Sequence, residues 1–505
     1  MLITGSLLLG IDIGTQGSKG FVADPEGHVL AQHFCEHPVL HPRPGWAEHD
    51  PEQTWWGDFV KITQALLAQP GIEPQAIAAI CVSGLIPDMA PTDADGRPLR
   101  NAILYSDNRA LEEIEYVNQL CGTQLTSEEI TPKLLWFLHH EPDLFARTRM
   151  FFNAHSYVVY KLTGQYTIDY VTACLVGAIY ATSRAEWRAD VCQELGIPLE
   201  ILPTPYPPAQ VVGEVTKAAA EQTGLAQGTP VLAGSGDVYS SLLGAGVIEP
   251  GEVMIYYGTA GLTAICHSSL EYLAREPYSV DDGFPFSYPA YMLTSGELVR
   301  WFRDQFGICE AEMEKWLDRS AYQLLDEEAS QIRPGCEGLI LLPYFLGQRS
   351  PVFDPLAKGV FFGLSMSHTR AHLYRAILES YGYGIRHGLE EAAPSQDIQR
   401  IVATGGGARS PLWRQIVSDI VGVAQEYVSR ADAPLADAYL AGYGVGLFPD
   451  FETIRRQWLE VTSVTQPRMD IHRRYQPFYR IYKDLHQALK DEFVALDRAL
   501  GETDT

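Results

Sequence analysis

The stretch that decides the fold is Leu9-Gly-Ile-Asp-Ile-Gly-Thr-Gln-Gly-Ser-Lys19, in which one acid stands among apolar residues just before a glycine-rich turn. Residues 8–13 have the apolar character of a buried strand, residues 14–17 form a turn, and residues 19–22 are typical of the returning strand. The pattern therefore predicts a β-hairpin. An ionised carboxylate in a buried strand is costly to desolvate unless it is paired or bound to a cation, so Asp12 needs a specific partner.

The turn of this hairpin is a candidate phosphate site. Backbone N–H groups in glycine-rich turns donate to phosphate oxygens, with Lys19 as a candidate cation and Asp12 as a candidate magnesium anchor. The stretch is not Gly-x4-Gly-Lys-Ser/Thr, and no Gly-x-Gly-x-x-Gly opens a helix, which disfavours a P-loop or a Rossmann fold. The alternative is that Gly14 and Gly17 only make a tight turn.

A similar pattern returns about one domain later. The stretch Glu252-Val-Met-Ile-Tyr-Tyr-Gly-Thr-Ala-Gly-Leu-Thr-Ala-Ile265 again indicates strand, Gly-Thr turn and strand. Two such hairpins suggest a duplicated architecture with a ligand in the cleft between the copies. A chain of 505 residues also exceeds the size of one hydrophobic core, which predicts two large domains.

Composition excludes several classes of protein. The formal net charge of −26 repels a nucleic-acid backbone and argues against RNA or DNA as the main partner. The sequence contains neither a run of about 18 apolar residues nor the features of a signal peptide, so we expect no membrane association. Eight cysteines without a Cys-x-x-Cys pair predict free thiols in a reducing cytoplasm.

Capping residues and apolar runs predict the remaining elements. Asp50 and Ser410 are each followed by proline and are suited to N-cap a helix. The predicted helices begin at Pro51 and Pro411 or cover 111–121, 132–140, 151–162 and 368–388, the predicted strands cover 76–83 and 401–404, and a loop covers 351–363.

Two further motifs place chemistry next to glycine. Asp237 ends Ala233-Gly-Ser-Gly-Asp237, where it is either the N-cap of the next helix or a general base at a cleft. The stretch Gly405-Gly-Gly-Ala-Arg-Ser-Pro-Leu-Trp-Arg-Gln415 opens with three glycines at a strand end, which let a flat ligand approach the backbone closely. A tight crossing with the following helix is the alternative.

These motifs, in this order, resemble the FGGY carbohydrate kinases over nearly the whole chain. The most specific match is Gly359-Val-Phe-Phe-Gly-Leu364 followed by His372-Leu-x-x-Ala376-Ile-Leu-Glu379, and it is preceded by Leu342-Pro-Tyr-Phe-Leu-Gly-Gln-Arg-Ser-Pro351 and Asp354-Pro-x-Ala-x-Gly359. The resemblance implies an α/β fold of two ribonuclease H-like domains of the actin, hexokinase and Hsp70 ATPase superfamily with an interdomain active-site cleft. Residues 1–247 would hold the sugar site, the first phosphate hairpin and the catalytic Asp. Residues 248–505 would hold the second phosphate hairpin and the adenosine site.

The resemblance also implies roles for individual residues at the nucleotide end. Asp237 would be the catalytic base, and Asp12 together with Asp237 would organise Mg²⁺. The residues expected along ATP are Gly14, Thr15, Gln16, Lys19, Gly258 and Thr259 at the phosphates, with Gly296, Gly405, Gly406, Gly407 and Ala408 completing the nucleotide site.

The sugar end departs from the pattern of the xylulose kinases, the group with the most similar general pattern. Ile80-Cys-Val-Ser-Gly-Leu-Ile-Pro-Asp88 lacks their Gln-Met-His, and Tyr105 replaces the Trp of the family's Trp-x-Asp-x-Arg loop. Val238 follows Asp237 where sugar-kinase relatives have Asn, and in the family's N-terminal signature Ile130 stands where a small or hydroxyl residue is expected. The residues expected near the substrate are Ile86, Pro87, Asp88, Asp107, Arg109 and Asp237. A salt bridge that only stabilises the loop is the alternative for Asp107 and Arg109.

The expected reaction is the ATP-dependent phosphorylation of D-xylulose to D-xylulose 5-phosphate. Another ketose or polyol, such as ribulose, fuculose, glycerol or a pentitol, is the alternative substrate. A non-catalytic ATP-driven switch is the competing class, against which the Asp237 position and the FGGY-specific loops argue. The sequence leaves the oligomeric state open, with a homodimer as the candidate assembly.

Overall fold

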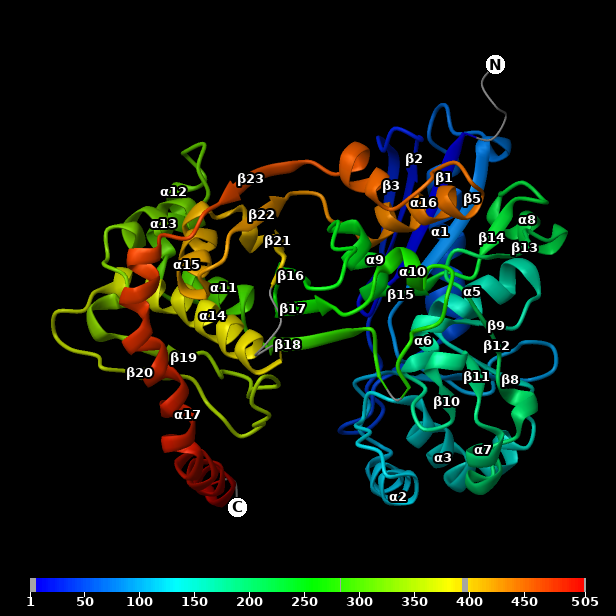
Figure 1. The fold of residues 1–505 in the computed structure, drawn as a ribbon, viewed down its shortest axis with the longest axis horizontal. Helices are drawn as coiled ribbons and strands as arrows, with labels where there is room; N and C mark the ends of the chain where they lie inside the picture. Colours follow the sequence, from blue (N-terminus) through cyan, green and yellow to red (C-terminus); the bar gives the residue numbers. More distant parts are fainter. Residues whose placement is uncertain (1–5, 282, 393–397, 504–505) are drawn as a thin grey trace. The chain divides into compact units, whose positions relative to one another are not determined.

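The computed structural model describes residues 6–281, 283–392 and 398–503 (Figure 1). The chain divides into two compact units, each built from three segments. Unit 1 comprises Met1–Ile248, Ser268–Pro285 and Ala431–Leu459, and unit 2 comprises Glu249–His267, Phe286–Arg430 and Glu460–Thr505. The predicted division between residues 247 and 248 lies one residue before the end of the first segment. It differs from the compact units at 268–285 and 431–459, which pack into unit 1.

The sheet of unit 1 is built around the predicted first hairpin. Its order is β13-β14-β5-β1-β2-β3, with β15 also paired to β5. Strand β1 is antiparallel to β2 and parallel to β5, so that Asp12 lies opposite both Lys19 and Ser83. The strands are β1 (Leu7–Ile13), β2 (Gly17–Ala23), β3 (Val29–Glu36), β5 (Ile77–Gly84), β13 (Val211–Glu214), β14 (Pro230–Leu232) and β15 (Ser235–Gly236).

The sheet of unit 2 repeats this plan, in the order β18-β17-β16-β21-β22-β23. Strand β16 is antiparallel to β17 and parallel to β21, β17 is antiparallel to β18, β21 is parallel to β22, and β22 is antiparallel to β23. Reading unit 1 from β3 to β13 gives the same succession of antiparallel and parallel pairs. The predicted duplication is therefore confirmed. The strands are β16 (Glu252–Tyr257), β17 (Gly261–Cys266), β18 (Phe286–Met292), β21 (Arg400–Thr404), β22 (Gln425–Val428) and β23 (Val461–Thr465).

Small two-stranded sheets join the loops of each unit. In unit 1 they pair β4 (Glu48–His49) with β7 (Ala102–Ile103), β6 (Ala90–Thr92) with β8 (Met150–Phe152), β9 (Thr167–Asp169) with β12 (Thr204–Tyr206), and β10 (Tyr180–Ala181) with β11 (Glu186–Trp187). In unit 2, β19 (Ile340–Leu342) pairs with β20 (Val360–Phe362).

Helices cover these sheets. The helices of unit 1 are α1 (Gly57–Leu67), α2 (Leu111–Cys121), α3 (Ile130–His140), α4 (Pro142–Phe145), α5 (Ala154–Thr163), α6 (Tyr170–Cys174), α7 (Ala189–Leu195), α8 (Lys217–Thr223), α9 (Asp237–Gly244), α10 (Leu270–Leu273) and α16 (Ala433–Gly444). Those of unit 2 are α11 (Gly296–Phe306), α12 (Ile308–Met313), α13 (Ala321–Ser330), α14 (Arg370–Ala392), α15 (Pro411–Val421) and α17 (Met469–Thr503).

Local capping explains where the predictions hold and where they do not. Asp50 accepts from two backbone N–H groups at the start of a π-helical turn, Pro51–Trp56, which continues into α1, and Ser410 caps α15 as predicted. The predicted helix 151–162 is wrong at its start, because Phe151 belongs to β8 and α5 begins only after Asn153, whose backbone N–H donates to Ser156 Oγ at 2.9 Å. The predicted loop 351–363 contains the short strand β20.

Helix α16 explains why unit 1 is discontinuous in sequence. It packs against β1, β5 and α9, and Figure 1 shows it in orange beside the blue strands. The apolar side chains of residues 433–444 are spread around the whole circumference of the helix, so no single face is apolar, and nearly all of these residues are buried. The helix therefore completes the core of unit 1, although it follows most of unit 2 in the chain.

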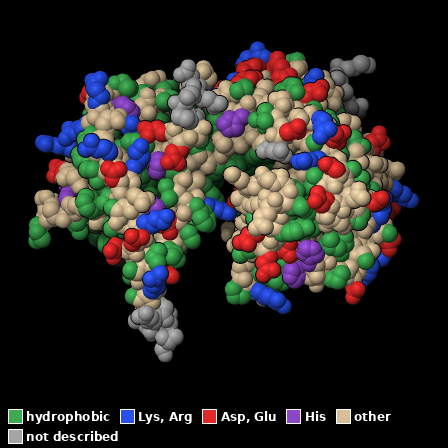
Figure 2. All heavy atoms as spheres, turned by 60° about the horizontal axis from the view of Figure 1, so that its bottom comes forward, with side chains coloured by type: hydrophobic (Ala, Val, Ile, Leu, Met, Phe, Trp, Pro, Cys, Tyr) green, Lys and Arg blue, Asp and Glu red, His purple; other side chains and the backbone are tan. Residues whose placement is uncertain are grey.

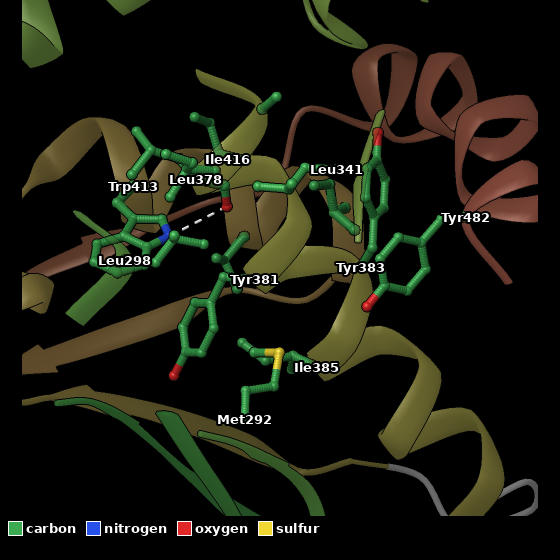
Figure 3. Close-up of a cluster of buried hydrophobic side chains, with 14 of the residues drawn as sticks. Met292, Leu298, Leu341, Leu378, Tyr381, Tyr383, Ile385, Trp413, Ile416 and Tyr482 are labelled. Atoms are coloured by element: carbon green, nitrogen blue, oxygen red, sulfur yellow. Dashed lines mark hydrogen bonds between the residues drawn. The ribbon is translucent and has the colours of Figure 1, made fainter. Parts of the chain in front are cut away.

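Unit 2 has its own aromatic core beside the β16 strand. Met292, Tyr381, Tyr383, Trp413 and Tyr482 are buried in one cluster (Figure 3). The indole of Trp413 donates to the carbonyl of Leu378 at 3.2 Å. This bond ties α15 to α14 and fixes the wall of the cavity described below.

Within the described ranges, the structure has no helix that is long and apolar enough to cross a bilayer. Figure 2 shows acidic side chains scattered among basic ones over one face of the molecule.

Candidate active site

The predicted catalytic acids lie together at the end of β1 in unit 1. Asp12 projects from β1, and Asp237 is the first residue of α9, directly after β15. Burial raises the pKa of Asp12 to about 6. Burial, and then the charge of Asp12, raise the pKa of Asp237 to about 8. A buried carboxyl group whose pKa is raised by a neighbouring carboxylate forms a site that favours a proton or a cation.

Asp237 is not an N-cap residue. Gly236 occupies the N-cap position of α9, and no side chain caps this helix. The N-cap alternative is therefore wrong. Glycine at this position lets the side chain of Ile86 pack closely over the chain just before Asp237.

A third acid lies behind Asp12 and was missed by sequence reasoning. Asp437, on α16, is completely buried. The hydroxyl of Ser83 lies 3.0 Å from Asp12 Oδ1 and 2.6 Å from Asp437 Oδ2, and Ser240 Oγ lies 2.6 Å from Asp437 Oδ1. Burial and the nearby charge of Asp12 raise the pKa of Asp437 well above its usual range. Asp437 carries the same sequence signal as Asp12, because it is an acid within an apolar run, Ala436-Asp-Ala-Tyr-Leu440.

Hydrogen counting indicates how these groups share protons. The single hydroxyl hydrogen of Ser83 serves only one of its two carboxylate neighbours. If Asp437 carries a proton and donates to Ser83, then Ser83 donates to Asp12 and every contact is satisfied. Asp437 and Ser83 thereby hold the Asp12 carboxylate in one orientation.

The donor set at this site suits a hard divalent cation. Asp12 and Asp237 offer carboxylate oxygens, which Mg²⁺ prefers, and their mutual charge repulsion is relieved by a cation. Across the described residues, the structure has no cluster of three or more His, Cys, Asp or Glu side chains arranged to hold a metal. Such a set fits Mg²⁺ that is bound by one or two carboxylates together with substrate phosphates.

Lys19, predicted as a phosphate cation, already has a partner. Its Nζ lies 2.7 Å from Asp432 Oδ1, just before α16, and both side chains are about one third exposed. The pair links β2 to the start of α16. Thr15 is half-buried and Gln16 is exposed in the turn beside it.

The predicted sugar-binding segment is more buried than expected. Ile86, Pro87 and Asp88 are buried in the loop after β5, and Asp88 is completely inaccessible. Asp88 accepts from the backbone N–H of Ala154 at 3.1 Å and from Asn153 Nδ2 at 3.4 Å. Asp88 therefore anchors the start of α5, while the amide oxygen of Asn153 lies buried with no hydrogen-bond partner.

Asp107 and Arg109 form the ion pair that was the alternative interpretation. Arg109 donates to both oxygens of Asp107 and to Glu48, and its guanidinium lies 3.6 Å from the ring centre of Trp46. Asp107 also accepts from the backbone N–H of Ala47. One guanidinium nitrogen of Arg109, Nη1, is buried with no hydrogen-bond partner, which leaves one donor for a ligand.

A buried lysine connects these groups electrostatically. Burial lowers the pKa of Lys133 to about 8, and the charges that act on it include those of Asp107 and Asp88. The charges that act on Asp88 include that of Asp237. The predicted sugar-binding acids and the predicted base thus belong to one neighbourhood in unit 1. No pattern in the sequence indicated a role for Lys133.

The predicted nucleotide residues of unit 2 surround a cavity of about 830 Å³. Gly258 and Thr259, in the turn of the second hairpin, line it together with Gly296, Gly406 and Gly407. The N–H of Gly296 donates to the carbonyl of Gly258 at 2.8 Å. A side chain at Gly296 would lie 2.6 Å from that carbonyl oxygen, so the start of α11 needs glycine to approach the turn.

The other two predicted glycine-run residues lie behind the cavity. Gly405 has a φ of +92°, which glycine adopts without strain, and it turns the chain away from β21. Ala408 is completely buried. Neither residue lines the cavity, so their contribution is to shape the loop that does.

Several polar cavity residues were missed by sequence reasoning. Asp326 accepts from Ser410 Oγ at 2.7 Å and from Tyr374 at 3.2 Å, and burial raises its pKa to about 6. Arg300 and Arg409 add two cations to the lining. Asp326 lies in an ordinary acidic helix, Ala321–Ser330, in which its spacing gave no signal.

Comparison with known proteins assigns the chain to a family. The FGGY family of carbohydrate kinases matches with its N-terminal domain at residues 7–244 and with its C-terminal domain at residues 253–441. The xylulose kinase of Bacillus subtilis (strain 168) is 27% identical over 97% of this chain and 98% of its own. The gluconokinase of Bacillus licheniformis is also 27% identical, over 97% of this chain and 98% of its own.

A solved structure gives the same assignment. The crystal structure of xylulose kinase from Rhodospirillum rubrum superposes with a TM-score of 0.82 at 28% identity, covering 96% of this chain and 99% of that chain. Two domain matches, full-length relatives and the duplicated sheet agree. The chain belongs to the FGGY family of carbohydrate kinases, and it is a sugar kinase with the two-domain fold of that family.

Proposed function

We propose that this kinase transfers the γ-phosphoryl group of MgATP to D-xylulose, forming D-xylulose 5-phosphate and ADP. The observation that carries the proposal is the acid pair of unit 1. Asp237 stands close enough to Asp12 for the Asp12 charge to raise its pKa, which is the environment of a general base. The similarity to xylulose kinases over nearly the whole chain supports the choice of sugar.

In this mechanism Asp237 accepts the proton of the attacking sugar hydroxyl. The sugar oxygen forms a bond to the γ-phosphorus as the bond from that phosphorus to the bridging oxygen breaks, and ADP leaves. Thr15, Gln16, Gly258 and Thr259 offer backbone N–H groups to the phosphates, while the N–H of Gly14 donates to the Gly17 carbonyl and closes the turn. Lys19 contributes positive charge from its pair with Asp432.

Asp12 and Asp237 would hold the magnesium ion. When bound with ATP, Mg²⁺ neutralises charge on the phosphate oxygens. Ser83 and Asp437 keep Asp12 oriented. The cavity of unit 2, with Gly296, Gly406, Gly407 and the backing residues Gly405 and Ala408, would take the adenosine.

At the sugar end, Arg109 would contact the sugar directly, whereas Asp88 and Asp107 would act indirectly. Arg109 has an unpartnered donor, which supports a direct contact with a sugar hydroxyl. Asp107 and Asp88 already accept several hydrogen bonds, so they would act by orienting Arg109 and α5. Ile86 and Pro87 would form an apolar wall next to Asp237.

A substrate panel tests the sugar assignment. The purified chain is incubated with MgATP and ketopentoses, ketohexoses, glycerol, pentitols or D-gluconate, and ADP is measured by a coupled assay. We expect the highest kcat/KM with D-xylulose. A tenfold preference for another acceptor would overturn the substrate, and ADP release that no acceptor stimulates would favour an ATP-driven switch.

A sugar acid is the second candidate substrate. The gluconokinase relative is as similar as the xylulose kinase, and buried Lys133 provides a cation near the predicted sugar-binding acids. Lys133→Met would then reduce kcat/KM for D-gluconate far more than for D-xylulose. Equal losses would assign Lys133 a purely structural role.

The remaining assignments follow from the same function. The cytoplasm is the proposed compartment, because the cysteines are free thiols. A sugar and ATP are the expected partners. A homodimer is the assembly to test, by light scattering on the purified chain.

A further inference from the structure

Two histidines contact the turn of the first hairpin from outside it. His37, just after β3, places Nε2 3.0 Å from the carbonyl oxygen of Gly14 and Nδ1 2.7 Å from Asp58 Oδ2. His49, in β4, places Nε2 3.1 Å from the carbonyl oxygen of Thr15. Both rings are buried, and they meet edge to face with centroids 4.9 Å apart.

The hydrogen-bond partners of His49 determine which of its ring nitrogens carries the hydrogen. Trp55 Nε1 has only a hydrogen to give, and it donates to His49 Nδ1 at 3.1 Å. Burial, and then the charge of His37, lower the pKa of His49 to about 4, so the ring is neutral. Its single hydrogen is therefore on Nε2, which donates to the Thr15 carbonyl.

His37 has acceptors at both nitrogens. The Gly14 carbonyl oxygen has no hydrogen to give, so Nε2 donates in that contact, and Nδ1 shares the second hydrogen bond with Asp58. Asp58 is almost fully buried and also lies 3.2 Å from Lys61 Nζ. His37 thus bridges α1 to the turn.

Holding these two carbonyls determines where the next N–H groups point. A trans peptide unit is planar, with its C=O and N–H directed to opposite sides. The peptides after Gly14 and Thr15 are trans. When the histidines hold the two carbonyls, the N–H groups of Thr15 and Gln16 face away from them, and neither donates to another described residue.

In the second hairpin the carbonyls of the corresponding Gly and Thr also accept hydrogen bonds, but from different donors. There, the backbone N–H of Gly296 donates to the Gly258 carbonyl at 2.8 Å, and that of Glu297 donates to the Thr259 carbonyl at 3.0 Å. Each Gly-Thr turn therefore has both carbonyls held from behind. In unit 2 the donors are amides at the start of α11, and in unit 1 they are imidazoles.

We propose that His37 and His49 are positioning residues that set the N–H groups of Thr15 and Gln16 to receive ATP phosphate. This inference rests on the proposed function, because it takes the first hairpin as a phosphate site. It assigns no contact between either histidine and ATP. Their effect on binding passes through the two carbonyls.

Paired substitutions separate this role from a general structural one. An Asn amide reaches roughly as far as Nδ1, so His37→Asn retains the Asp58 contact and loses Gly14, and His49→Asn retains Trp55 and loses Thr15. A Gln amide reaches roughly as far as Nε2, so His37→Gln and His49→Gln retain a donor to the turn. His28→Asn is the control, since His28 pairs with Asp24 in the exposed turn after β2.

The readout is affinity by calorimetry for ATP, with Mg²⁺ present, and for adenosine. We expect both Asn variants to weaken ATP by about tenfold, both Gln variants to stay within about threefold of wild type, and adenosine affinity to remain unchanged in all. Unchanged ATP affinity in both Asn variants would overturn the proposal. Equal losses for ATP and adenosine would also overturn it, because they indicate a folding defect.

Sugar-dependent ADP formation, measured on the wild type and the same variants, tests the proposed function separately. If wild type shows no sugar-dependent ADP formation, the kinase assignment to these substrates fails. If it does show that activity while the Asn variants bind ATP normally, only the positioning role fails. Weaker ATP binding in the Asn variants together with rescue by Gln supports the positioning role, whether or not the substrate assignment holds.

Discussion

The two Gly-Thr hairpins have the same frame but different chemistry. In each, an antiparallel pair of strands joins a parallel neighbour, and the turn carbonyls of Gly and Thr are held from behind. Two residues before the turn glycine, unit 1 has Asp12 where unit 2 has Tyr256. The Tyr256 side chain is exposed, and its carbonyl accepts from Tyr381 at 2.9 Å.

The two units therefore share the backbone geometry of the hairpin, and the reactive group comes from the residue that differs, Asp12 in place of Tyr256. Asp12, Asp237 and Asp437 all belong to unit 1, and the hairpin of unit 2 lies against an aromatic core and a cavity. We therefore expect charge changes to be severe in the first hairpin and mild in the second.

The largest effect is expected at Asp237. Asp237→Asn removes the base and retains the size of the side chain, so kcat should fall by about 10² to 10⁴. ATP affinity should change little, because the variant leaves both hairpins intact. Steady-state kinetics and calorimetry measure the two quantities, and near-normal kcat would contradict the assignment.

The next effect compares the equivalent positions directly. Asp12→Asn should lower Mg²⁺-dependent kcat by on the order of 10², while sugar affinity changes little. Tyr256→Phe should alter kcat by less than about threefold, since the exposed residue keeps its ring at the cavity wall and loses no charge. Comparable losses in both variants would mean that the two hairpins are chemically equivalent.

A pH profile sharpens the role of the acid pair. A carboxyl group acts as a base only when deprotonated, and the pKa of Asp237 is raised to about 8. The kcat/KM for the sugar should therefore rise with pH through this value and level off above it. In Asp12→Asn the remaining activity should reach its plateau at lower pH, because a charge that raises the pKa of Asp237 is gone. An unchanged midpoint would show that the two acids do not interact.

The smallest effect is expected behind Asp12. Asp437→Asn provides an amide that donates to Ser83 as a protonated carboxyl group would, so kcat should stay within about threefold. Asp437→Leu leaves Ser83 and Ser240 without this partner and should lower the free energy of unfolding by about 1–3 kcal/mol. Denaturant unfolding and kinetics on both variants measure this contrast. Equal kinetic losses would indicate that Asp437 works as a charged group.

Much of the frame was predictable from the sequence, because hairpins have strong local signals. The runs at Leu9–Lys19 and Glu252–Ile265 combine apolar alternation with a glycine turn, and both hairpins form as predicted. The discontinuous units were not predictable in this way. An apolar helix such as α16 shows that it is buried, but its pattern does not show which sheet it covers.

The site was predictable in its backbone and less so in its partners. Spacing identified Asp12, Asp237 and the glycines, since these lie in local motifs. Whether an acid is already engaged depends on residues distant in sequence, as Glu48 is to Arg109 and Asn153 to Asp88. Asp437 was missed because its partner Ser83 lies 354 positions away.

The placement of α16 has a consequence for how the protein is made. The chain runs through six segments that alternate between the units, so it passes from one unit to the other five times. A nascent chain that ends before residue 433 leaves the surfaces of β1 and β5 that contact α16 uncovered. Unit 2 is likewise incomplete until β23 and α17 have been synthesised. Neither unit is complete until the ribosome has translated most of the message, so a gene cut at the domain border would encode two fragments that each lack part of their core.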